Sequence, residues 1–161
     1  MHRVAQLVAH VRARVDPEEA ARVRSILPDP AVALFESMPV ADRRHGLDVA
    51  ERLLRTGHDD RDLLAAALLH DAAKGHRMRL WHRVGGVMLE ALAPSLLRRL
   101  ASPDQASWRH PFHLYLHHQP MSAALSTDAG CPPRVGAFIR GEVADEDLQL
   151  LRVLTGADDA G

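Results

Sequence analysis

The sequence predicts an all-α protein that folds as a single-domain helical bundle. Apolar residues recur at helical spacing in most segments, and residues typical of helix starts and ends bracket these segments. No segment alternates apolar and polar residues with the β-branched enrichment expected of strands. A chain of 161 residues is long enough to bury one sizeable core.

The expected helices of the N-terminal half follow one another closely. The stretch Asp16-Pro17-Glu18-Glu19 indicates a helix start, because it combines a capping side chain, a proline at the first position and acidic residues near the positive end of the helix dipole. Gly57 is suited to end a later helix, and Asp59 or Asp60 to cap the next one, which ends near Gly75. The expected helices span residues 4–15, 17–27, 31–38, 40–57 and about 61–75.

The C-terminal half is also expected to be helical. Residues 79–101 form one long helix or two abutting helices, with Pro94 at the start of the second. Further helices are expected at 110–118, at 121–130 with Gly130 as terminator, at 132–140 and at 145–159. Residues 1–36 are expected to be accessory N-terminal helices, and residues 37–161 the main domain.

Composition argues against several classes of partner. The formal net charge is −1, from 20 basic and 21 acidic residues, which gives no reason to expect binding to nucleic acid or a membrane surface. No segment is apolar enough over the length needed to cross a bilayer, and the N-terminus does not resemble a signal peptide. The single cysteine, Cys131, allows no intrachain disulfide and fits a reducing compartment, so we expect a cytoplasmic protein. The oligomeric state stays open, a homo-oligomer included.

Eleven histidines in so small a domain prompt a search for metal ligands. His45 lies within one expected helix, and His70 and Asp71 end the next. A short turn joins these helices, so they should pack antiparallel and bring the three side chains together. Asp158 and Asp159 end another apolar helix. Imidazoles and carboxylates that converge in this way suit a borderline divalent cation.

Three short motifs carry a resemblance to a known family. "RH" at 44–45, "LHDAAK" at 69–74 and "GADD" at 156–159 resemble the H…HD…D signature of the HD-domain superfamily of all-helical, metal-dependent phosphohydrolases. The similarity runs from about residue 38 to the end. It implies that His45, His70, Asp71 and one terminal aspartate ligate a metal, and Asp158 fits the pattern better than Asp159.

The segment from His117 to Glu142 adds a second resemblance. One bacterial branch of the superfamily, which splits diadenosine polyphosphates, has the pattern H-x-P-x-G-A…I-R-x-H. His118 matches its first histidine, with neighbouring His117 as the alternative, and Ser122 stands where glycine is usual. Glu142 stands in place of the second histidine, as a candidate ligand of a second metal or as a sign that this metal is lost. We favour the single-metal arrangement.

The resemblance implies a phosphohydrolase that acts on a small-molecule phosphate ester or anhydride, such as a nucleotide. The cofactor would be a divalent ion, Fe, Mn, Co or Zn, with Mg as a further candidate. Asp71 would ligate the metal and orient the attacking water, and Lys74 would hold a phosphate oxygen. The alternative is a degenerate HD domain that binds metal or nucleotide as a regulatory module.

Overall fold

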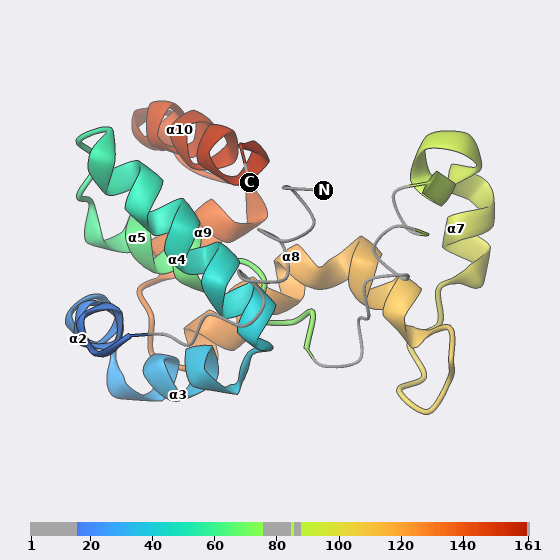
Figure 1. Cartoon of the computed structure of the whole chain (residues 1–161). Helices are drawn as coiled ribbons and strands as arrows, with labels where there is room; N and C mark the ends of the chain where they lie inside the picture. Colours follow the sequence, from blue (N-terminus) through green and yellow to red (C-terminus); the bar gives the residue numbers. More distant parts are fainter. Residues whose placement is uncertain (1–15, 76–84, 86–87, 161) are drawn as a thin grey trace, which may run out of the picture.

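The computed structural model describes residues 16–75, 85 and 88–160, and within these residues the chain is helical, with no strand. The helix expected at 4–15 lies outside the described residues. Figure 1 shows the elements in chain order. They are α2 (Pro17–Ile26), α3 (Asp29–Ser37), α4 (Val40–Arg55), α5 (Arg61–Leu69), α7 (Pro94–Leu100), α8 (His110–Asp128), α9 (Pro133–Arg140), the 3-10 turn η1 (Asp145–Asp147) and α10 (Leu148–Asp159).

The expected helix starts are confirmed where the described residues include them. Asp16 caps α2 through a capping box with Glu19, and Asp60 rather than Asp59 caps α5 by accepting a hydrogen bond from the Leu63 amide. Pro94 begins α7. Polar caps of this kind satisfy amides that have no partner inside the helix.

The end of α5 differs from the expectation. The helix ends at Leu69, not near Gly75, and residues 70–75 form a series of turns. The Ala73 amide donates to the hydroxyl oxygen of Ser122 on α8, so it is unavailable for the helical bond to the carbonyl of Leu69. The polar sequence His70 to Lys74 therefore continues as a turn anchored to α8.

Two helices expected at 110–118 and 121–130 are one continuous helix, α8, with Pro120 inside it. Proline removes one backbone donor and usually interrupts a helix. Pro120 and Gln119 are exposed, so water can replace the lost hydrogen bond. Gly130 follows the helix with φ +83°, the left-handed conformation that glycine adopts without strain.

Helix α5 is the centre of the core. Every residue from 63 to 69 is buried, and α4, α9, α2 and α10 all pack against α5. Helices α2 and α3 contribute Val23, Ile26 and Phe35 to the same hydrophobic cluster, so the expected accessory helices share this core. In Figure 1, α8 runs from this body toward α7, which stands apart at one end of the molecule.

Helices α4 and α5 approach very closely at Gly46. A Cβ atom at this position would lie 3.0 Å from the carbonyl oxygen of Leu68 and 3.1 Å from that of Ala67. Only glycine permits this backbone separation without displacement. The contact sets the spacing between His45 on α4 and the end of α5.

Arg134 on α9 joins three elements at the opposite end of α5. Its guanidinium lies 2.8 Å from the Asp60 carboxylate that caps α5 and 2.6 Å from Asp147, the residue before α10. Burial alone would raise the pKa of Asp60, but the Leu63 amide and Arg134 outweigh it and lower that pKa. The hydrogen bond from Arg134 also lowers the pKa of Asp147.

A search of the described helices finds none that is long and apolar enough to cross a membrane.

Candidate metal centre

Three helices bring His45, His70 and Asp158 together. His45 comes from the middle of α4, His70 from the residue after α5, and Asp158 from the last turn of α10. His45 Nε2 lies 2.7 Å from Asp158 Oδ1, and His70 Nε2 lies 3.4 Å from the same oxygen. One candidate ligand atom from each residue lies within 4.8 Å of the others, which makes this a potential metal-binding cluster.

The His70 imidazole has the arrangement expected of a metal ligand. Its Nδ1 lies 2.9 Å from the carbonyl oxygen of Ala67 and donates to it, which leaves the lone pair on Nε2. Nε2 is buried and has no hydrogen-bond partner among the described residues, although Asp158 Oδ1 and Asp71 Oδ1 lie 3.4 and 3.5 Å away. A buried nitrogen without a partner is costly, and a cation would satisfy it. The donor set therefore fits a divalent ion.

Asp71 lies beside the cluster and is more deeply buried than its three members, with 1% of its surface exposed. Lys74 Nζ lies 2.6 Å from Oδ1 and 2.7 Å from Oδ2, and its hydrogen bond goes to Oδ2. Oδ1 has no hydrogen bond among the described residues and faces His70 Nε2. Asp71 thus lies beside the cluster, and the Lys74 ammonium pairs with both of its oxygens and neutralises its charge.

The charged groups in and beside the cluster shift one another's pKa values. The hydrogen bond from His45 and the nearby imidazole of His70 hold the pKa of Asp158 well below its ordinary value. Burial by itself lowers the pKa of His70, but the carboxylates of Asp158 and Asp71 outweigh it and raise that pKa. Burial would raise the pKa of Asp71, but His70 and Lys74 lower it. Without a cation, the carboxylates thus stabilise the charged form of the His70 imidazole, and a metal ion would replace this positive charge.

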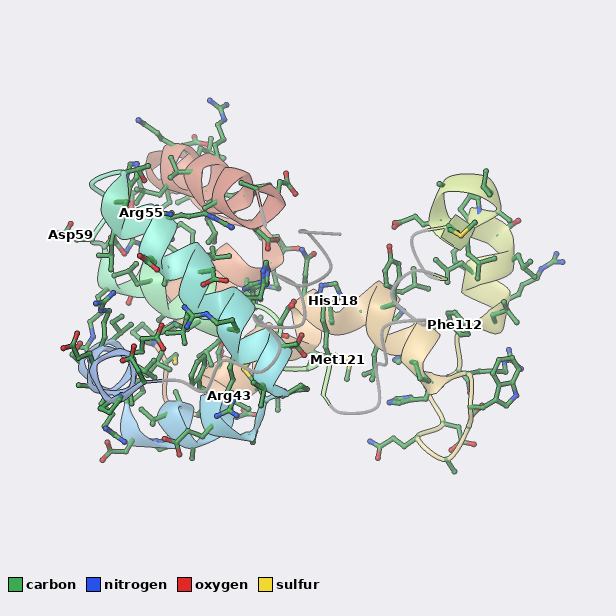
Figure 2. The ribbon with its side chains drawn as sticks, in the orientation of Figure 1. Arg43, Arg55, Asp59, Phe112, His118 and Met121 are labelled. Atoms are coloured by element: carbon green, nitrogen blue, oxygen red, sulfur yellow. The ribbon has the colours of Figure 1, made fainter. Side chains whose placement is uncertain are left out.

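His118 reaches the edge of the cluster, whereas His117 does not. His118 Nδ1 donates to the Tyr115 carbonyl, and burial together with Lys74 lowers the pKa of this imidazole. Figure 2 places His118 where α8 meets the body of the molecule. His117 is exposed, and its ring lies against His113.

The structure also separates the remaining candidates. Asp158 lies in the cluster, and neighbouring Asp159 is exposed. The side chain of Glu142 is 73% exposed and lies 3.1 Å from Arg140, at the end of α9. Glu142 is therefore not among the residues that the structure gathers at the cluster, and its role as a ligand stays a prediction.

The cluster is open on one side. The side chain of Asp158 is 42% exposed and that of His45 31%, whereas that of His70 is only 15% exposed. A cavity of about 100 Å³ adjoins His70 and Asp158, with Gln119, Ile139 and Thr155 in its lining. Water and a small substrate group can therefore approach the cluster from the side of α9 and α10.

Two residues that position the cluster were not predicted as such. Gly46 sets the close approach of α4 and α5, and Ser122 holds the turn that carries Asp71 and Lys74. A glycine inside a helix, next to a candidate ligand, signals such an approach because it otherwise costs about 1 kcal/mol in helix stability. Nothing in the sequence shows that Ser122 would accept a bond from Ala73, because the two residues lie on different elements.

Comparisons of the chain with protein-family models, with curated proteins and with solved structures find no match.

Proposed function

We propose that this protein hydrolyses a phosphate ester or anhydride, such as that of a nucleotide, with the help of a divalent cation held by His45, His70 and Asp158. The observation that carries the proposal is the convergence of these donors from three helices around the unpartnered, buried His70 Nε2. The resemblance of the surrounding motifs to the HD-domain signature supports it.

The openness of the cluster favours an enzyme over a structural metal site. Structural sites are closed by four protein ligands, whereas catalytic sites keep a position for water or substrate. Here three donors gather and two of them are partly exposed. A cation bound there would lower the pKa of a water molecule and polarise a phosphoryl oxygen.

Different residues of the chain would bind the cation, orient the attacking water and hold the phosphate. His45, His70 and Asp158 would hold the cation, with Asp71 Oδ1 and His118 at its edge. Asp71 would orient the attacking water, because its buried carboxylate has a lowered pKa and so stays ionised, and its Oδ1 has no hydrogen bond among the described residues. Lys74 would balance this carboxylate and hold a phosphate oxygen as negative charge develops there.

One observation favours the alternative, a degenerate HD domain that binds metal or nucleotide without turnover. Lys74 is already paired with Asp71, so less of the positive charge of Lys74 is available to attract a phosphate substrate. A regulatory module needs only binding, whereas an enzyme must also let this pair rearrange as phosphate arrives. The two functions differ in turnover, not in metal binding.

The test is hydrolysis of a panel of nucleotides and other phosphate esters by metal-loaded protein. Asp71→Asn keeps the shape of the side chain and removes its charge, so activity should fall by more than the factor of about 10²–10⁴ typical of a single general base. Asp159→Asn, an exposed matched control, should leave activity unchanged. Full activity in Asp71→Asn would contradict the mechanism, and metal binding without turnover of any substrate would favour the regulatory module.

A further inference from the structure

Helix α8 carries a second group of histidines, outside the candidate metal centre. His110, His113 and His117 are spaced three and four residues apart and so share one face of the helix. The rings of His113 and His117 have centroids 4.5 Å apart, and those of His110 and His113 are stacked at 5.8 Å. Three imidazoles thus lie in a row.

The members of this row differ in how they are held. His110 is buried and its Nδ1 lies 3.2 Å from the Ser102 carbonyl oxygen, so its ring is fixed. Within the part of the chain that the structure describes, the imidazoles of His113 and His117 make no hydrogen bond, and His117 is exposed. These two rings therefore keep their nitrogens available, and the stacked His110 restricts the ring of His113.

We propose that His113 and His117 form a second metal-binding site, a two-imidazole chelate for a divalent transition cation such as Ni²⁺, Zn²⁺, Co²⁺ or Cu²⁺. Residues four apart on a helix have Cβ atoms about 5–6 Å apart, which lets two imidazoles reach one ion at about 2.0–2.1 Å from each nitrogen. The separation of 4.5 Å between the ring centroids shows that the two imidazoles already lie in contact. Water completes the coordination on the exposed side.

The donor set defines the class of ion. Imidazole favours borderline transition metals, whereas Mg²⁺ and Ca²⁺ require oxygen ligands. Burial and the neighbouring His117 and His110 lower the pKa of His113, which favours the neutral ring that can donate a lone pair to a metal. The helix supplies a rigid base for both rings, so little ordering is needed on binding.

This site is independent of the proposed function, because it shares no residue with His45, His70 and Asp158. The two sites also differ in character. The first combines imidazole with carboxylate around a buried nitrogen, whereas the second is a chelate of imidazoles on a helix surface. The second site should therefore bind its ion less tightly and exchange it more readily.

The experiment uses tag-free, full-length protein in which His45→Ala and His70→Ala together disable the first site. Titration with Ni²⁺ should show one bound ion per chain, and Mg²⁺ should not bind. In the same background, either His113→Ala or His117→Ala should weaken Ni²⁺ binding about 10²-fold, because the second ligand acts at high effective concentration. His58→Ala, which removes a histidine elsewhere, should change nothing.

A second measurement does not depend on these variants. In the wild-type chain, with one equivalent of Zn²⁺ already bound to fill the tighter first site, substoichiometric Ni²⁺ should selectively broaden the imidazole NMR signals of His113 and His117. Ni²⁺ binding that survives both His113→Ala and His117→Ala would overturn the proposal. The proposal would also be overturned if the variant that carries His45→Ala and His70→Ala bound no Ni²⁺ although circular dichroism showed it to be folded. Wild-type spectra without selective broadening of the His113 and His117 signals would overturn it as well. None of these results would bear on phosphohydrolase activity.

Discussion

The substitution Gly46→Ala tests how the fold holds the candidate metal centre together. The added Cβ would lie 3.0 Å from the Leu68 carbonyl oxygen and 3.1 Å from that of Ala67. These are backbone atoms of a helix whose residues are at most 1% exposed at this point, so they cannot yield toward solvent. Overpacking of a core costs about 1–3 kcal/mol, whereas replacing glycine by alanine inside a helix returns about 1 kcal/mol. We expect a net loss of about 1 kcal/mol in the free energy of unfolding.

Gly156→Ala is the matched control, because it makes the same chemical change in α10. A Cβ at Gly156 would have no atom within 4 Å, so only the gain in helix propensity remains, about 1 kcal/mol. The two variants should therefore differ by about 2 kcal/mol, which corresponds to about 4–8 °C in melting temperature for a chain of this size.

The assay is thermal and urea denaturation followed by circular dichroism, with chelator present so that bound metal adds no stability. Gly46→Ala should also weaken metal binding, because separation of α4 from α5 moves His45 away from His70. Gly156→Ala should retain it. The reasoning would be refuted if Gly46→Ala were as stable as Gly156→Ala.

Three further predictions concern other residues. Arg134→Gln should lower the urea midpoint at neutral pH. The carboxylates of Asp60 and Asp147, which bind Arg134, have lowered pKa values. The loss of stability caused by Arg134→Gln should therefore be complete above their ordinary pKa of 3.8 and should shrink as the pH falls through their folded-state pKa values. An equal loss of stability at pH 7 and at pH about 2 would contradict these ion pairs. Asp158→Asn should weaken Co²⁺ or Zn²⁺ binding in a titration far more than Asp159→Asn. Equal losses of affinity would contradict the assignment of Asp158, rather than Asp159, as the ligand. Glu142→Ala should leave the number of tightly bound ions unchanged on elemental analysis, and a lost ion would make Glu142 a ligand.

Much of the helical fold was predictable because its signals are local. The cap before α2, Pro94 at the start of α7 and the apolar periodicity of α4 depend on residues close in sequence, and each prediction is confirmed. The prediction that α5 ends near Gly75 was wrong, because a tertiary contact determines where this helix ends. The Ala73 amide binds Ser122, which lies on α8, 49 residues further along the chain.

In the candidate site, too, some features follow from the local sequence and others depend on tertiary contacts. The antiparallel packing expected from the short turn between α4 and α5 does bring His45 beside His70, and the structure adds Asp158 from α10. The sequence left open the choice between adjacent residues, because neighbours on a helix face different directions. The pairing of Lys74 with Asp71 also depends on turn geometry that appears only in the folded chain.

The most direct test of the account is the metal content of tag-free protein, because the central claim is that His45, His70 and Asp158 hold a divalent cation. Wild-type protein and the His70→Ala variant would each be reconstituted with Mn²⁺, Co²⁺ or Zn²⁺, dialysed against metal-free buffer and measured by elemental analysis. The account predicts that wild-type protein retains about one ion per chain more than His70→Ala, since this substitution removes the buried donor at the centre of the cluster. Equal metal content in the two proteins, or no retained metal in the wild type, would contradict it.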